Sequence, residues 1–189
     1  NTSPGDIWFV NVNGDDVIND FDRTVIGNPQ PDFIFGFNNQ FGYKNFDLSI
    51  FFQGSYGNDI WNGVRVSHEG MESTYNQFTS TLNRWNGEGS SNTMPRAIYA
   101  DPNRNNRAST RWVEDGSYLR LKNLTFGYRF TQDWLKKIGA KSLRLYLSFD
   151  NLWTLTNYSG LDPEVGLWGL DYGIYPTSRV YMFGASVKF

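Results

Sequence analysis

Hydrophobic and polar residues alternate with a period of two in several stretches of the chain, which is the pattern of β-strands. In "DFIFGFNNQFGY", Phe33, Phe35 and Phe37 occupy one face, and Gly36 and Asn38 occupy the other. No stretch has a comparable helical period. The predicted strands lie at about residues 33–43, 46–55, 118–130, 142–153 and 179–189. The pattern therefore predicts an all-β chain with five long strands.

The connections between these strands are alternately short and long. Only Lys44 and Asn45 separate the first two strands, which indicates a tight hairpin. A short link at about 131–141 joins the third strand to the fourth. The long segments lie at about residues 1–32, 56–117 and 154–178. In an antiparallel sheet this alternation places all the long loops at one end.

The third strand, "YLRLKNLTFGYRF", changes phase within its length. Leu119 and Leu121 begin on one phase, whereas Leu124 and Phe126 continue on the other. A slip of one residue near Lys122–Asn123 predicts a β-bulge.

The length and the two faces of the strands favour a membrane-spanning barrel over a soluble β-sandwich. Runs of this length suit a tilted strand that crosses a bilayer. Aromatic residues are expected toward both ends of the apolar face, as in two interfacial girdles. They are Tyr118 and Trp153 at the long-loop end, and Tyr43, Tyr128 and Trp134 at the short-turn end. The opposite face carries polar residues suited to a watery interior: Asp47, Gln53, Arg129, Arg144, Tyr146 and Asp150.

The fold class predicted is therefore a partial transmembrane antiparallel β-barrel with long extracellular loops. Five strands cannot close a barrel, and an open edge in lipid would leave backbone groups without partners. We expect the chain to complete a barrel with further strands, and Asn1 not to be the biological start. A soluble glycan-binding β-sandwich remains the alternative.

Composition narrows the class of protein further. The net charge of −2 gives no basic surface for nucleic acid. Cysteine is absent, which excludes disulfides and thiolate metal sites within the chain. Aromatic residues make up 17% of the chain, yet mean hydropathy is −0.52, and no apolar run reaches the length of a transmembrane helix.

The stretch "NVNGDDVINDFD" has the ligand spacing of a calcium-binding loop. Its candidate ligands are Asn11, Asn13, Asp15, Val17 through its carbonyl, Asn19 and Asp22. Asn11, Asp16 and Asp22 depart from the preferred Asp, Gly and Glu at their positions, and no helical period flanks the loop. The alternative is a solvated turn that leads into the first strand. The sequence indicates no required cofactor, and calcium in the 11–22 loop is the one candidate ion.

No group of residues predicts catalysis, and we expect no enzyme. Glu114 and Asp115 are expected to cap the third strand and to pair with a loop arginine such as Arg111. His68 is the only histidine and has no cysteine near it. The run with Arg104, Arg107 and Arg111 is expected to be a solvated loop face.

Several segments resemble one known family in wording and in order. "GDIWFVNVNGDD", "DLSIFFQGSYGNDIWN", "RWVEDGSYLRLKNLTFGY", "LRLYLSFDNLWTLTNYSGLDPEVG" and "DYGIYPTSRVYMFGASVKF" resemble the C-terminal end of SusC/RagA-type TonB-dependent outer-membrane transporters. The resemblance covers nearly the whole chain and is weakest from about Arg65 to Ala108.

The resemblance implies that these strands are the last five of a 22-stranded barrel whose plug domain and N-terminal strands lie outside this chain. It implies import of oligosaccharides or peptides beneath a SusD-like surface lipoprotein, with energy from the TonB complex. The C-terminus would be periplasmic, with Phe189 as the signal for the barrel-assembly machinery, and lipid would surround the wall. A SusC-like barrel that is only a scaffold within a larger outer-membrane complex is the functional alternative.

Aromatic and acidic residues in the long loops are candidate contacts with the lid or the substrate. They are Trp61, Trp85, Asp162, Glu164, Trp168 and Asp171. Each has a plain alternative, because such residues also fold a loop onto itself.

Overall fold

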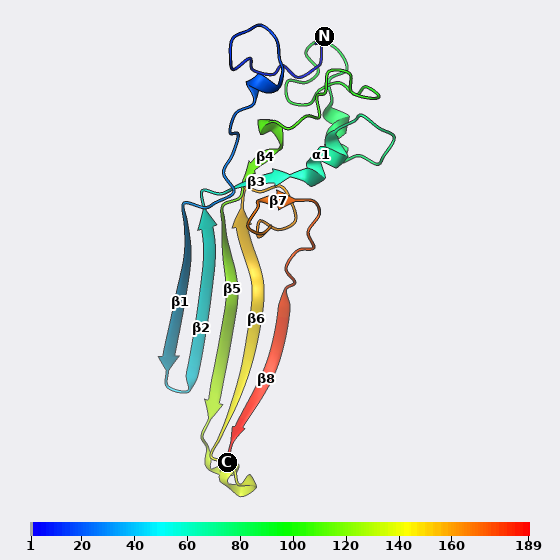
Figure 1. The fold of residues 1–189 in the computed structure, drawn as a ribbon. Helices are drawn as coiled ribbons and strands as arrows, with labels where there is room; N and C mark the ends of the chain where they lie inside the picture. The colour runs from blue at the N-terminus through cyan, green and yellow to red at the C-terminus, as the bar shows by residue number, and fades with distance from the viewer. Residues whose placement is uncertain (1) are drawn as a thin grey trace. The chain divides into compact units, whose positions relative to one another are not determined.

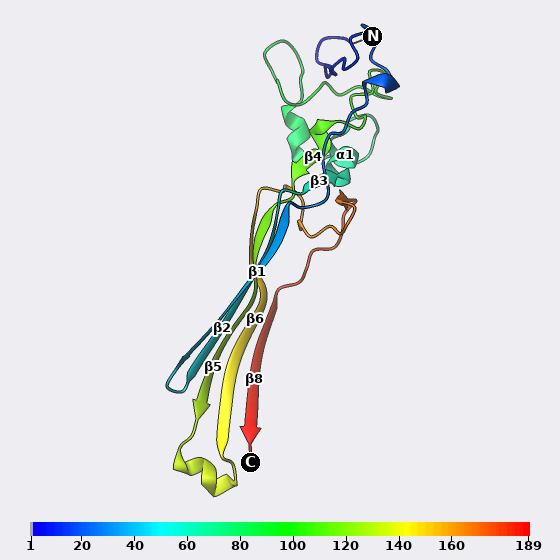
Figure 2. The same cartoon turned by 60° about the vertical axis from the view of Figure 1, so that its left-hand side comes forward.

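A computed structural model describes residues 2–189, and its main element is an antiparallel sheet of five strands in the order β1-β2-β5-β6-β8 (Figure 1). These strands are β1 (Phe33–Tyr43), β2 (Phe46–Tyr56), β5 (Tyr118–Phe130), β6 (Ser142–Thr156) and β8 (Val180–Lys188). Turned by 60°, the same strands form one curved layer (Figure 2). The sequence places strands in the same five places, and β6 continues from Trp153, where the predicted strand ends, to Thr156.

Turn and bulge fix the register of this sheet. Tyr43 pairs with Phe46, so Lys44 and Asn45 form the predicted hairpin turn, in which Lys44 has a φ of 53°. The register of β5 with β6 shifts between Leu121 and Asn123. The predicted bulge is therefore confirmed.

The bulge also corrects one prediction about the apolar face. Tyr118 pairs with Ser55 and Thr156, and so it lies on the polar face. The expectation that Tyr118 belongs to an aromatic girdle was wrong. Its physical reason is the extra residue at the bulge, which reverses the faces of every residue above it.

Contacts divide the chain into two compact units. One comprises residues 30–58, 115–164 and 175–189, and it contains the five-stranded sheet. It also contains η4 (Asp133–Ile138), between β5 and β6. The other comprises residues 2–29, 59–114 and 165–174 and is built from the long segments. The buried Ile60 and Trp112 belong to this second unit.

The long segments contain short elements where the sequence indicated only loops. They are η1 (Asp20–Asp22), β3 (Asp59–Asn62), α1 (Gly63–Glu69), η2 (Thr79–Asn83), η3 (Thr110–Trp112), β4 (Val113–Asp115) and β7 (Leu170–Asp171). The seven residues of α1 are too few for a helical period to appear in the sequence. Asn62 caps α1 by accepting a hydrogen bond from the backbone N–H of Arg65. Among the described residues no helix has the length and apolar character needed to cross a membrane.

Candidate functional site

One face of the five-stranded sheet is apolar and exposed. Phe37 on β1 is 60% exposed, and Tyr181 and Phe183 on β8 are 63% and 70% exposed. A β-sandwich would cover such a face with a second sheet. These side chains are exposed, as a transmembrane barrel predicts and as the core of a sandwich would not be.

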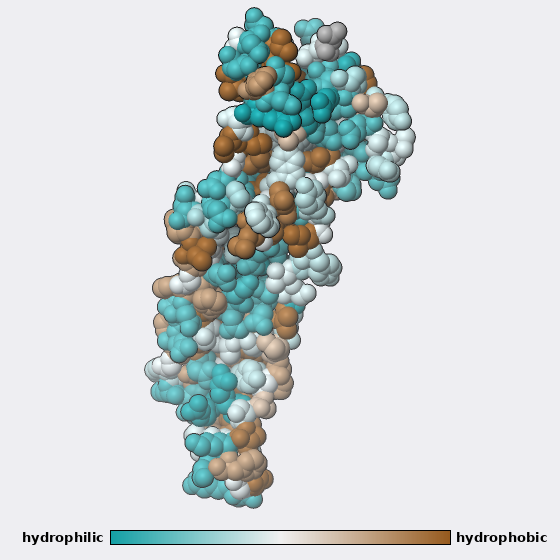
Figure 3. Space-filling view, viewed as in Figure 1, coloured by the Kyte–Doolittle hydropathy of each residue, from teal (hydrophilic) through white to brown (hydrophobic). Residues whose placement is uncertain are grey.

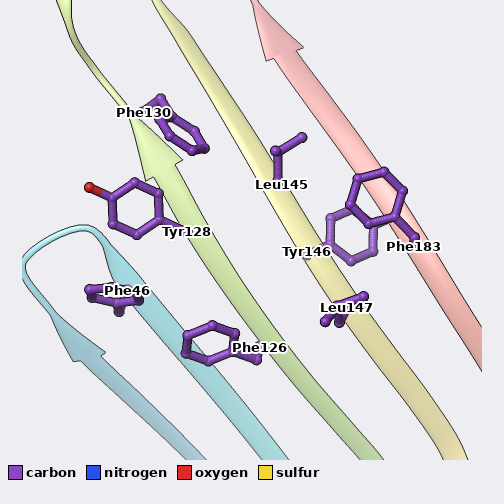
Figure 4. Close-up of a pocket in the computed structure, with 8 residues that line it drawn as sticks. All are labelled: Phe46, Phe126, Tyr128, Phe130, Leu145, Tyr146, Leu147 and Phe183. Carbon is purple, nitrogen blue, oxygen red and sulfur yellow. The ribbon is translucent and has the colours of Figure 1, made fainter.

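Figure 4 shows the centre of this apolar face, an open groove of about 430 Å³. Side chains from four neighbouring strands line it: Phe46, Phe126, Tyr128, Phe130, Leu145, Leu147 and Phe183. The rings of Phe46 and Tyr128 lie 4.6 Å apart across the β2–β5 pair. Aromatic pairs of this kind stabilise neighbouring strands. The groove makes this face apolar and uneven, as expected of a surface that packs against lipid acyl chains.

The opposite face is polar, and in Figure 3 hydrophilic residues follow the strands in the view of Figure 1. Asp47 on β2 accepts hydrogen bonds from Nε and Nη2 of Arg144 on β6, at 2.9 and 2.5 Å. This bidentate pair passes over β5 at Gly127, where a Cβ atom would lie 2.6 Å from the carboxylate. A glycine at this position therefore allows one ion pair to join three strands.

Further polar contacts link β5 to β6. Asn123 donates to the carboxylate of Asp150 at 2.7 Å, and Thr125 shares a 2.8 Å hydrogen bond with Ser148. Tyr146 covers Gly184 of β8, whose added Cβ would meet its ring. The predicted polar face is confirmed for Asp47, Arg144, Tyr146 and Asp150, whose contacts join neighbouring strands. Gln53 and Arg129 lie in the same phase, opposite Arg120 and Arg144.

A buried charged cluster ties the segment after β6 to the top of β5. The guanidinium of Arg120, only 3% exposed, donates to Asp162 at 2.6 Å and to Glu164 at 2.5 Å. Lys122 and the hydroxyl of Tyr118 also donate to Glu164, at 3.0 and 2.9 Å. Because a buried charge needs partners, this cluster fixes the course of residues 157–164.

The carboxyl of Asp162 is held ionised within this cluster. Burial alone would raise its pKa, but hydrogen bonds from Arg120 and from the backbone N–H groups of Glu164 and Thr177 lower it to about 2. Thr177 precedes β8, so this one carboxylate joins both ends of the connection between β6 and β8. Sequence reasoning missed Arg120, because the phase change at the bulge obscured its face.

The candidate calcium loop is folded by its own hydrogen bonds. Asp22 accepts hydrogen bonds from the backbone N–H groups of Val12 and Asn19 at 2.8 and 2.7 Å. These bonds lower the pKa of Asp22, and the bond from Asn19 has the largest effect. Asn11 accepts from Gly14, and Asp15 accepts from Val17. No cluster of three or more His, Cys, Asp or Glu side chains that could hold a metal occurs within residues 2–189. The calcium site stays a prediction.

Other candidate contacts are placed differently from one another. Trp168 is 82% exposed, Trp61 is half-buried on β3, and Trp85 is half-buried beside Gly5. Asp171 is buried and accepts hydrogen bonds from the N–H groups of Gly173 and Ile174. As contacts with a lid or a substrate, these residues and the carboxylates of Asp162 and Glu164 stay predictions. The role of the exposed Phe189 in membrane assembly is likewise untested.

Glu114, which precedes β5, pairs with an arginine from the long segment between β2 and β5. Arg65 of α1, not Arg111, donates to Glu114 at 2.8 Å. The expected pairing of Glu114 with an arginine of the long segment is confirmed, with Arg65 as the partner where Arg111 was the example. Arg65 also pairs with Glu69 one helical turn away, so its guanidinium joins α1 to Glu114 on β4. His68 stacks on Phe78 and contacts the carbonyl of Val64.

The sequence is similar to several curated proteins along its whole length, although no family model matches it. It is 39% identical to TonB-dependent receptor P3 of Formosa agariphila, across 100% of this chain and 19% of that protein. It is 29% identical to TonB-dependent receptor SusC of Bacteroides thetaiotaomicron, across 100% of this chain and 18% of that protein. The chain thus spans about a fifth of the length of these relatives.

Solved structures give the same relationship. The RagAB peptide importer in its closed-closed state superimposes with a TM-score of 0.75 and 27% identity, over 87% of this chain and 18% of that one. Its open-open state gives a TM-score of 0.71 and 26% identity, over 85% of this chain and 17% of that one. Together with the two-faced sheet, these similarities show that the chain is homologous to a part of the TonB-dependent receptors of the SusC/RagA type.

Proposed function

We propose that this chain forms part of the wall and the extracellular loops of a nutrient importer in the bacterial outer membrane. The sheet supplies five of the 22 strands of a closed barrel, its apolar face turned to lipid and its polar face to the interior. The observation that carries the proposal is the exposed apolar face opposite a hydrogen-bonded polar face. A transmembrane barrel has this arrangement.

The two edges of the sheet also favour a larger barrel. Within the described residues, β1 and β8 are the outermost strands. In lipid an unpaired strand edge leaves N–H and C=O groups without partners, at a cost of several kcal/mol per group. Neighbouring strands on both sides would satisfy these groups. An 11-residue strand such as β1, with a rise of about 3.3 Å per residue and a tilt of about 45°, also spans the ~25 Å of an apolar barrel band.

The orientation proposed places the long segments outside the cell. The hairpin at Lys44–Asn45, the link at 131–141 and Phe189 then lie on the periplasmic side. Bacterial barrels have short periplasmic turns and longer extracellular loops. A SusD-like lipoprotein would act as a lid on the outer side, and the TonB complex would act through parts of the protein other than this wall.

The substrates proposed are oligosaccharides or peptides. One structural relative is described as a peptide importer, and another relative carries the name SusC. Specificity would come from the loops, because the wall residues on the polar face are occupied by hydrogen bonds to one another.

Cysteine accessibility tests the proposed topology directly, since the chain has no cysteine of its own. In the full-length protein in intact cells, Asn86→Cys in the long segment is expected to react with a membrane-impermeant maleimide. Asn45→Cys in the hairpin is expected to react only after the outer membrane is permeabilised. The unsubstituted protein is the control for other cysteines.

Equal labelling of both positions in intact cells would contradict the orientation, and recovery of the unlabelled protein in the soluble fraction would contradict the barrel. Migration of the folded protein on a gel should shift on heating, as it does for barrels that resist detergent. Uptake by cells then separates the importer from the scaffold alternative. A scaffold would keep the labelling pattern without supporting uptake.

A further inference from the structure

The unit built from the long segments contains an open pocket that the barrel wall does not explain. Its volume is about 500 Å³. Segments far apart in sequence line it, namely residues 5–8, Trp85, residues 91–95 and Arg111. All of them belong to the same compact unit. A pocket of this size holds a small molecule or one end of a longer one.

A buried salt bridge builds the wall of this pocket. The side chain of Asp6 is fully buried and accepts from Nε and Nη2 of Arg96 at 2.8 and 3.1 Å. Asn105 adds a hydrogen bond to Asp6 at 3.0 Å and accepts from the backbone N–H of Ile7 at 2.8 Å. The backbone of Trp85 donates to the carbonyl of Met94. These bonds join the segments that line the pocket. They also occupy both carboxylate oxygens of Asp6, so this carboxylate does not face a ligand.

Arg111 is the cation of the pocket, and its hydrogen-bonding capacity is poorly used. Its Nη1 is buried without a hydrogen-bond partner, and its Nη2 donates to the sulfur of Met94 at 2.9 Å, which is a weak acceptor. The guanidinium lies 4.2 Å from the ring of the buried Trp112. Burial lowers its pKa to about 10, so it remains charged at neutral pH. A half-buried charge with so few strong acceptors is costly unless a ligand supplies one.

Trp85 supplies an aromatic surface in the same pocket. The backbone of Gly5 packs against its ring, and a Cβ added to Gly5 would lie 2.3 Å from the ring. The indole is therefore held in place from one side. Ser91, Asn92 and Thr93 line the pocket beside it and carry hydroxyl and amide groups.

We propose that this pocket binds an anionic sugar ring, with the acidic group at Arg111 and the ring against the indole of Trp85. A guanidinium prefers carboxylate and sulfate oxygens, and the neutral polar side chains suit sugar hydroxyls. This inference rests on the proposed function, because it names the substrate class that the importer would bind at its outer loops. The acid is a uronate or a sugar sulfate, which share this chemistry.

Calorimetric titration of the full-length protein in detergent tests the proposal. The probes are trigalacturonate, a galactose trisaccharide with sulfate groups, the neutral galactose trisaccharide and triaspartate. We expect one or both acidic saccharides to bind at least about tenfold more tightly than the neutral one, and to lose about tenfold to a hundredfold in affinity in Arg111→Gln. The affinity should also fall as salt is added.

A control variant separates binding from net charge, and a stability measurement separates binding from folding. Arg84→Gln removes the same charge from an exposed position in the same unit, and it should leave binding unchanged. Trp85→Phe should weaken the binding of acidic and neutral saccharides alike. Arg111→Gln should unfold at the same temperature as the unsubstituted protein or a higher one, because it removes a poorly satisfied charge.

Four results would overturn the proposal. They are no binding of either acidic saccharide, equal loss in Arg84→Gln and Arg111→Gln, no loss in Arg111→Gln, and triaspartate binding as tightly as the saccharides. The last result would assign the pocket to acidic peptides. Cysteine labelling and the heat shift do not depend on this pocket, so failure here and failure of the barrel are distinguishable.

Discussion

Asp47 and Arg144 form a bidentate ion pair although a whole strand, β5, runs between their own strands. The pair exists because Gly127 has no side chain beneath it. A Cβ there would lie 2.6 Å from both carboxylate oxygens and 2.7 Å from Nε of Arg144. The three residues act as one unit, in which the glycine is as necessary as the two charges.

Gly127→Ala is therefore expected to break the Asp47–Arg144 pair. We expect a loss of about 1–3 kcal/mol in the free energy of unfolding, from overpacking between two charged groups. Urea titration of the detergent-solubilised full-length protein measures it. Gly42→Ala is the matched control, because nothing lies within 4 Å of its added Cβ. Equal loss in both variants would show that the ion pair is not the cause.

Arg120→Met is expected to release the segment after β6. The substitution leaves Asp162 and Glu164 as neighbouring carboxylates without their shared guanidinium. Breaking a buried pair in this way costs about 3–5 kcal/mol. The remaining ion pair between Lys122 and Glu164 should reduce this loss.

The readout for this release is the anisotropy of a dye on Leu161→Cys, which lies in the segment and is 76% exposed. Anisotropy should fall in Arg120→Met. It should not change in Arg23→Met, whose ion pair with Asp20 is solvent-exposed. Unchanged anisotropy in Arg120→Met would mean that other contacts hold the segment.

The same label should report a dependence on pH. The pKa of Asp162 is about 2 in the folded chain, below its ordinary value of 3.8. A lowered pKa means that the carboxylate stabilises the anchored segment above about pH 4, and that this contribution is lost as the pH falls toward 2. Anisotropy should stay constant from pH 7 to 5 and decrease below pH 4. In Asp162→Asn the anisotropy should be low already at pH 7, because the labelled segment is no longer anchored.

The loop from Asn11 to Asp22 should keep its shape without calcium, because backbone N–H groups already occupy its side-chain oxygens. Asp22→Ala removes the acceptor of two of these bonds and should speed cleavage of the loop by a protease. Asp20→Ala is the control. Cleavage of the unsubstituted protein should be equal in EDTA and in calcium. Protection by calcium that disappears in Asp22→Ala would instead establish the calcium site that the spacing predicts.

Strand pattern was readable from the sequence because alternation reports the two faces of a sheet directly. The bulge was readable for the same reason, since Leu121 and Leu124 stand in opposite phases. The effect of the bulge on Tyr118 was not readable. It requires knowing that every residue above Lys122 lies on the face opposite to the one that regular alternation predicts. The partner of Glu114 was not readable either. Arg65 lies 49 positions away, and only the capped helix α1 brings it close.

The bulge at Lys122 has a consequence for how this strand tolerates changes in length. Below the bulge, Leu124 and Phe126 lie on the apolar face. Above it, Arg120 has the same even spacing from them but lies on the polar face. Because Lys122 is the extra residue in the pairing of β5 with β2, its loss would let Leu121 follow Asn123 in regular alternation. Leu119 and Leu121 would stay on the apolar face, and Arg120 would stay on the polar face. The bulge is thus a position at which the strand can lose one residue without exchanging its faces, whereas loss of one residue from a regular part of the sheet would exchange the two faces beyond it.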